Sequence, residues 1–175
     1  MFNGCKANNV EHMKRLIDEG RIMEGVDEVD VKAGDYVYVN GGTLHAATAG
    51  SLSFEIEENC DATYRLYDFD RVDKNGKKRP LQVENALTSL CPEQQSEVKH
   101  YEPNTLIRER MYWTSYKPAV EFIENNTEMF IFAILLRGST MVMNQRVLPG
   151  TAVVLEPGDR FDANGADFML ASIIK

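Results

Sequence analysis

One histidine, His45, ends a stretch whose residue types and spacing suit a metal or substrate site. Residues 34–45 read as an apolar strand between two glycine-bearing turns, the first at Gly34 and the second at Gly41 and Gly42. A histidine at a strand end beside a glycine-rich turn can aim a ring nitrogen into the mouth of a barrel, where metals are commonly bound. The pattern therefore favours His45 as a metal ligand.

The segment that follows, residues 51–57, predicts a strand with one polar and one apolar face. Successive side chains of a strand point to opposite sides, so Glu55 would lie on the polar face and Phe54 on the apolar one. Residues 59–71 then combine many charged and aromatic side chains. Carboxylates and guanidinium groups are thus expected close together.

A family resemblance rests on four segments taken in order: residues 34–45, 54–56, 61–71 and 73–79. They resemble the bacterial class I mannose-6-phosphate isomerases, which are zinc enzymes built from cupin barrels. The resemblance covers only the later part of such an enzyme. It implies an all-β protein of cupin-type jelly-roll barrels, with an incomplete first barrel that carries short helices and a small second barrel.

The resemblance also implies a zinc site, of which this chain carries one ligand. The family holds its metal on a glutamine and a histidine separated by one residue, a glutamate, and a later histidine. Only the last has a counterpart here, His45. The nearest replacement, Gln82-Val83-Glu84, lies in a helix-like segment after His45 and matches the wrong part of the pattern. A catalytic zinc needs three protein ligands and an open position, so zinc is expected as the family's cofactor, with its other ligands missing from this segment.

The chemistry implied is the interconversion of mannose 6-phosphate and fructose 6-phosphate. It moves a proton between adjacent carbons and develops negative charge on an enediolate. By resemblance, Glu55 matches the family's active-site carboxylate and Arg65 its catalytic arginine, while Arg71 is a candidate contact for the substrate phosphate. A structural alternative stays open for Arg65, which could simply pair with Asp61 or Asp68 in an exposed contact worth roughly 0–1 kcal/mol.

Five basic residues crowd around an Asn-Gly pair; they are Arg71, Lys74, Lys77, Lys78 and Arg79. Such a cluster could attract a sugar phosphate, but Asn-Gly is also typical of an exposed hairpin turn. For the three lysines we favour the exposed turn.

Two domains are predicted, a partial catalytic cupin barrel over residues 1–92 and a small cupin-like barrel over residues 100–175. Helices are predicted over residues 9–20 and 83–90, and a polar linker over 91–100. Beyond the linker come six strand candidates divided by turns: residues 105–113, 119–123, 129–137, 140–147, 151–155 and 168–174.

An internal repeat connects the two halves at a separation of 116 residues. Val31-Lys32-Ala33-Gly34 reappears as Val147-Leu148-Pro149-Gly150, and Gly42 corresponds to Gly158. At the same separation His45 becomes Phe161. The repeat predicts a second barrel that keeps the turns and has an apolar ring in place of the metal ligand.

Composition excludes several classes of function. The 175 residues carry 19 Lys and Arg against 27 Asp and Glu, a formal net charge of −8, which disfavours binding to nucleic acid. No apolar run approaches the about 20 residues of a spanning helix, and the first residues do not read as a signal peptide. We therefore expect a cytoplasmic protein without membrane contact.

Partners follow from the incomplete first barrel, whose unpaired strand edges would invite association. A homo-oligomer, or a separate chain that supplies the front half of the barrel, would complete it. Two other functions stay open: a non-catalytic sugar-phosphate-binding or scaffold cupin that retains Arg65 and Arg71, and a different metal cupin such as a dioxygenase. The second is disfavoured because the usual His-x-His pair and its glutamate are absent from the sequence.

Overall fold

Strands dominate the computed structural model, which describes residues 1–60 and 62–174. Two compact units are formed, Met1–Lys99 and His100–Lys175. The elements of the first part are β1 (Phe2–Cys5), α1 (Val10–Asp18), the 3₁₀ turn η1 (Ile22–Gly25), β2 (Val26–Glu28), β3 (Asp35–Val37), β4 (His45–Ala46), α2 (Val83–Ser89) and β5 (Val98–His100). Asp61, one of the partners considered for Arg65, lies outside the described residues.

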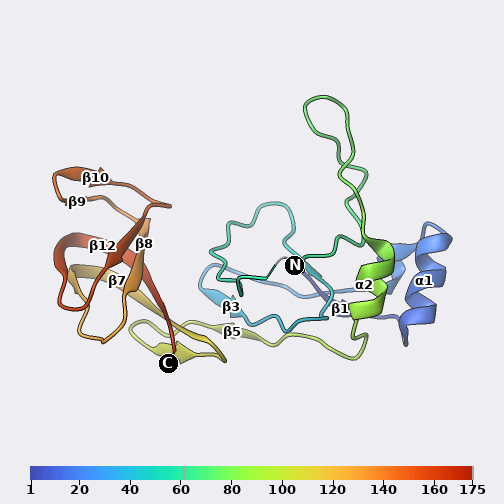
Figure 1. The fold of residues 1–175 in the computed structure, drawn as a ribbon, viewed down its shortest axis with the longest axis horizontal. Helices are drawn as coiled ribbons and strands as arrows, with labels where there is room; N and C mark the ends of the chain where they lie inside the picture. Colours follow the sequence, from blue (N-terminus) through green and yellow to red (C-terminus); the bar gives the residue numbers. More distant parts are fainter. Residues whose placement is uncertain (61, 175) are drawn as a thin grey trace. The chain divides into compact units, whose positions relative to one another are not determined.

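Both predicted helices form, and they lie side by side in the first unit (Figure 1). Asn9 caps α1, because its side-chain oxygen accepts a hydrogen bond from the backbone nitrogen of His12 at 2.8 Å. The inward side of α1 buries Met13 and Leu16, which pack with Leu87 of α2 in the core of this unit. Local apolar spacing was therefore sufficient to predict α1 to within two residues at either end.

The first unit contains a small three-stranded antiparallel sheet with the order β2-β1-β4, and β3 pairs with β5 in a two-stranded sheet. Asn3 of β1 is fully buried. Its side-chain amide donates to the carbonyl oxygen of Ser96 at 2.7 Å and accepts from the Ser96 backbone nitrogen at 3.1 Å. These two bonds tie the segment after α2 to the sheet.

The strand predicted for residues 51–57 is not present. These residues follow β4 as an irregular segment, on which Leu52 is 100% exposed. An alternating sequence becomes a strand only where a neighbouring strand supplies hydrogen-bond partners and a core covers the apolar face. No described strand pairs with this segment, so the prediction was wrong here although the pattern is regular.

The second unit is a five-stranded antiparallel sheet with the order β11-β8-β12-β7-β6, together with a separate hairpin of β9 and β10. Phe168 is fully buried at the centre of its core, beside Leu135 and Leu155. The strands are β6 (Leu106–Arg108), β7 (Tyr112–Glu124), β8 (Ile131–Arg137), β9 (Thr140–Val142), β10 (Gln145–Val147), β11 (Ala152–Leu155) and β12 (Arg160–Ile173).

The repeat at 116 residues is visible in the backbone. Gly34 and Gly150 have φ values of 90° and 87°, and Gly42 and Gly158 have 89° and 87°. Such positive values favour glycine. The turns that precede β3 and β11 each close with a backbone hydrogen bond of 3.0 Å. The nitrogen of Asp35 donates to the carbonyl oxygen of Lys32, and the nitrogen of Thr151 donates to that of Leu148.

Phe161 occupies the position in the second unit that corresponds to His45 in the first, as the repeat predicted. Its ring packs against the core and lies 5.5 Å from the ring of Phe168.

None of the described helices is long and apolar enough to cross a membrane.

Candidate functional site

A loop that passes through the first unit carries the candidate site. In this loop Leu66 is buried in the core formed with α1 and α2, and two residues later the side chain of Asp68 is only 7% exposed. Phe69 stacks on Phe2 of β1 with ring centroids 5.8 Å apart. The apolar contacts on either side hold the Asp68 carboxylate in a fixed place.

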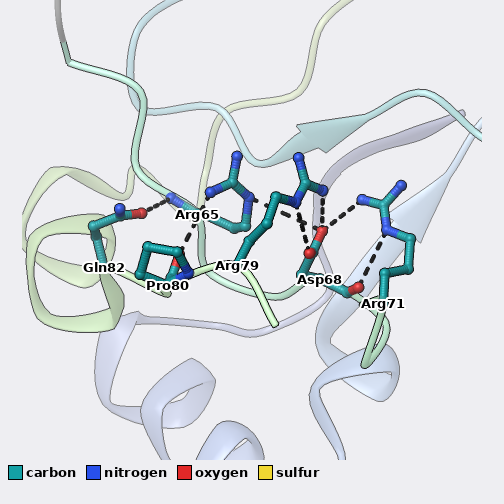
Figure 2. Close-up of polar contacts among 6 residues, drawn as sticks. All are labelled: Arg65, Asp68, Arg71, Arg79, Pro80 and Gln82. Atoms are coloured by element: carbon teal, nitrogen blue, oxygen red, sulfur yellow. Dashed lines mark hydrogen bonds and ion pairs between the residues drawn. The ribbon is translucent and has the colours of Figure 1, made fainter. Parts of the chain in front are cut away.

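Three arginines gather around this carboxylate (Figure 2). Arg79 donates from Nε to Oδ2 of Asp68 at 2.8 Å and from Nη2 to Oδ1. Arg71 donates from Nη2 to Oδ1 at 2.6 Å and from Nε to the backbone oxygen of Asp68 at 3.2 Å. Arg65 completes the group, with its Nε 3.9 Å from Oδ1. We call Arg65, Asp68, Arg71 and Arg79 the arginine cluster.

The backbone of Arg65 is fixed by the residue just before α2. Its nitrogen donates to Oε1 of Gln82 at 2.8 Å, and the nitrogen of Gln82 donates to the carbonyl oxygen of Arg65 at 2.9 Å. The side chain reaches the carbonyl oxygen of Pro80 from Nη1 at 3.4 Å. Gln82 thus positions Arg65 relative to the cluster.

A hairpin brings Arg79 into contact with Asp68, from which it is separated by eleven positions in the sequence. Val72 pairs with Lys78 in an antiparallel bridge, which places Arg71 opposite Arg79. The turn at Asn75 and Gly76 is exposed, and Figure 1 shows it as the narrow green loop that extends beyond α2. The three lysines lie on this exposed part, where Lys78 pairs with Asp70 at 2.5 Å.

The electrostatics of the cluster favour an ionised Asp68. The hydrogen bond from Arg79 is the largest cause that lowers the pKa of the carboxyl, burial opposes it, and the bond from Arg71 lowers it further, to about 2. The same contact raises the pKa of Arg79. Three guanidinium charges against one carboxylate leave the cluster with two uncompensated positive charges.

Loss of the Asp68 contacts is expected only in strong acid. The pKa of Asp68 is lower in the folded chain, about 2, than its ordinary value of 3.8. Its contribution to stability is therefore complete above about pH 4 and disappears as the pH falls towards 2. Thermal unfolding of the wild type and of Asp68→Asn between pH 2 and 7 would show this. The melting temperatures should differ above pH 4 and converge below it, and a constant difference would contradict the assignment.

The other two predicted site residues lie apart from these contacts. His45 is exposed at the start of β4, and its Nδ1 lies 2.9 Å from the carbonyl oxygen of Thr43. Glu55 is exposed on the irregular segment and accepts a hydrogen bond from the Ser53 hydroxyl at 2.8 Å. In the described part of the chain, no hydrogen bond or ion pair joins His45 or Glu55 to the arginine cluster. The structure brings together Arg65 and Arg71 only.

A metal site does not follow from these residues. Within residues 1–60 and 62–174, no three His, Cys, Asp or Glu side chains come together as metal ligands would. His45 alone does not provide the three protein ligands that a catalytic zinc requires. The donor set of these residues alone therefore does not fit zinc.

Comparisons with known proteins address the family. The chain is 42% identical over 84 residues to a mannose-6-phosphate isomerase of Bacillus subtilis, and 39% identical over 87 residues to that of Streptococcus mutans. These matches cover 48% and 50% of this chain but only 27% and 28% of the relatives. The resemblance to mannose-6-phosphate isomerases is confirmed. No protein-family model matches the chain.

The fold is confirmed by a solved structure. The crystal structure of the mannose 6-phosphate isomerase from B. subtilis is similar with a TM-score of 0.70 and 22% sequence identity, over 98% of this chain and 60% of that one. Together with the predominance of strands and two short helices, this similarity establishes the all-β, cupin-type fold. The chain spans well under a third of the curated mannose-6-phosphate isomerases that it matches.

Sequence reasoning missed part of the arginine cluster. Asp68 entered only as an alternative partner of Arg65, although it lies three residues from both Arg65 and Arg71. Arg79 entered only as one of five basic residues around the Asn-Gly pair, with no partner assigned to it. The signal for Arg79 was the Asn-Gly turn itself, because a hairpin closed by Val72 and Lys78 sets Arg79 opposite Arg71.

Proposed function

We propose that this chain is a mannose-6-phosphate isomerase-like protein that interconverts mannose 6-phosphate and fructose 6-phosphate. The observation that carries the proposal is the arginine cluster. The two arginines that the resemblance assigns to the substrate, Arg65 and Arg71, contact one buried carboxylate. Guanidinium groups suit both a phosphate and an enediolate, because they donate in a planar fork and keep their charge.

The proposed reaction is a proton transfer between neighbouring carbons. A base removes the proton from C2 of the open-chain aldose, which leaves an enediolate with its negative charge on the C1 oxygen. The C2 hydroxyl proton passes to the C1 oxygen, the base returns its proton to C1, and the product is the 2-ketose. Glu55 is the proposed base, Arg65 stabilises the negative charge that develops on the enediolate oxygens, and Arg71 binds the phosphate.

Glu55 needs an ordered surrounding to act as this base. It lies on the exposed segment that contains Leu52, whose sequence alternates like a strand. We propose that a second polypeptide, either another copy or a chain carrying the front half of the barrel, pairs with this segment and orders Glu55. Zinc with His45 as one ligand would likewise need its remaining ligands from outside the described residues. We place this assembly in the cytoplasm.

Turnover tests the proposal directly. The purified chain is incubated with mannose 6-phosphate and zinc, alone and with a chain that carries the front half, and fructose 6-phosphate is followed over time. Formation of fructose 6-phosphate in either mixture is expected. Binding of mannose 6-phosphate without turnover in both mixtures would contradict isomerisation and support a sugar-phosphate-binding protein instead. Absence of both binding and turnover would remove the proposal altogether.

A further inference from the structure

The unused nitrogens of the arginine cluster are its most informative feature. Arg65, Arg71 and Arg79 each direct one terminal nitrogen to the same side, upwards in Figure 2 and away from Asp68. These nitrogens are Nη2 of Arg65, Nη1 of Arg71 and Nη1 of Arg79, and none of them makes a hydrogen bond to another described residue. The side chains are 28%, 62% and 47% exposed, so solvent reaches them.

We propose that the arginine cluster is a preformed site for an oxyanion with two negative charges, in which Arg79 joins Arg71 as a binding group and Asp68 is a positioning residue. Arg79 was assigned no role by the resemblance, and the hairpin brings it opposite Arg71. The inference deepens the proposed function and relies on it only for the identity of the natural ligand, a sugar phosphate.

Charge supports a doubly charged ligand. The cluster carries two uncompensated positive charges, and a phosphate monoester carries about −1.5 to −2 charges near pH 7. The guanidinium groups of Arg71 and Arg79 can donate to different oxygens of a tetrahedral anion, and Arg65 adds a third positive charge beside them while its own donors serve the enediolate in the proposed reaction. A carboxylate ligand would neutralise only half of the uncompensated charge.

Asp68 solves the problem that three like charges repel one another. Its two oxygens accept from Arg71 and Arg79 and lie near Arg65, while its own burial holds it still. The arginines therefore keep their orientation before a ligand arrives, which lowers the entropy cost of binding. The effect of Asp68 is on geometry, and its own charge opposes the anion.

Isothermal titration calorimetry of the full chain with sulfate tests the site without any sugar. We expect the Arg79→Lys variant, which keeps the charge and loses the fork, to bind sulfate about tenfold more weakly. Arg21→Lys is the matched control, because Arg21, like Arg79, donates two hydrogen bonds to one carboxylate, that of Glu24, but no second arginine takes part in its ion pairs with Glu19 and Glu24. Its sulfate affinity should equal that of the wild type.

The Asp68→Asn variant separates positioning from simple attraction. Removing a negative charge should tighten sulfate binding if only net charge matters, whereas loss of orientation should weaken it. We expect weaker sulfate binding and a lower ratio of sulfate to nitrate affinity, with Asp68→Glu recovering part of both. A merely structural role would leave the ratio unchanged. Thermal unfolding confirms that each variant is folded.

The natural ligand class is tested with mannose 6-phosphate across pH. The second proton of a phosphate monoester leaves near pH 6, so affinity should rise between pH 5 and 7 while that for sulfate stays constant. Unchanged sulfate binding in Arg79→Lys, or tighter binding in Asp68→Asn, would overturn the inference. Sulfate binding that depends on Arg79 without any isomerase turnover would retain this site and reject the proposed function, and turnover independent of Arg79 would do the reverse.

Discussion

An Arg65→Lys variant is expected to lose about 10²–10³-fold in kcat for the interconversion of mannose 6-phosphate and fructose 6-phosphate. Lysine keeps the positive charge but has a single flexible ammonium in place of the planar fork, so it cannot both remain beside Asp68 and stabilise an enediolate. Arg65 is well placed for such a role because Gln82 fixes its backbone with two hydrogen bonds. Steady-state kinetics in the mixture that shows turnover would measure the loss.

The control for this prediction is Arg108→Lys, a variant of an exposed arginine on β6 in the second unit. Its kcat should stay within about twofold of the wild type, as for a substitution away from the substrate. The KM of Arg65→Lys should change much less than kcat, because the proposed contact strengthens as charge develops. An equal kcat in Arg65→Lys and wild type would show that Arg65 is a structural partner of Asp68 only.

The second large effect concerns stability. Phe168→Ala is expected to lower the free energy of unfolding of the second unit by about 3–5 kcal/mol, because a buried phenyl ring leaves a cavity that the sheet cannot fill. The ring is 0% exposed and lies against Phe161. Denaturant unfolding followed by the fluorescence of Trp113, which packs against the same core, would report on this unit.

A matched variant distinguishes burial from residue type. Phe132 lies on β8, next to β12 in the same sheet, but is 40% exposed. Phe132→Ala should therefore cost clearly less than Phe168→Ala in the same experiment, because less apolar area is removed from the core. Equal losses for the two phenylalanines would mean that this core is packed differently from the structure described above.

Local signals predicted the helices well, and long-range pairing limited the prediction of strands. The apolar spacing that predicted a helix over residues 9–20 lies within α1 itself, so the sequence alone placed both ends to within two residues. Residues 112–124 form one strand where two were expected, because β7 continues through Pro118 and Ala119 with a shift in its register against β12. Pairing along β12 decides this continuation, and single-sequence reasoning does not contain it.

The site was predicted in part for a related reason. Arg65 and Arg71 came from the family resemblance, and their common partner Asp68 could be read from the spacing of three residues on either side. Arg79 required the hairpin register, which the Asn-Gly turn suggests but does not fix. Glu55 and Phe54 were expected on opposite faces of a strand. No described strand pairs with this segment, so the strand and its two faces do not form.

The hairpin that carries Arg79 places different constraints on its tip and on its two arms. Its tip, between the Val72 and Lys78 bridge, is exposed, so substitutions there leave the arginines below untouched. The pairing register of the two arms is constrained, because shifting one arm by a single residue would turn the Arg79 side chain to the opposite face. The residue types of the tip can therefore vary, whereas its length cannot vary freely. Related chains should differ here by paired insertions, one in each arm.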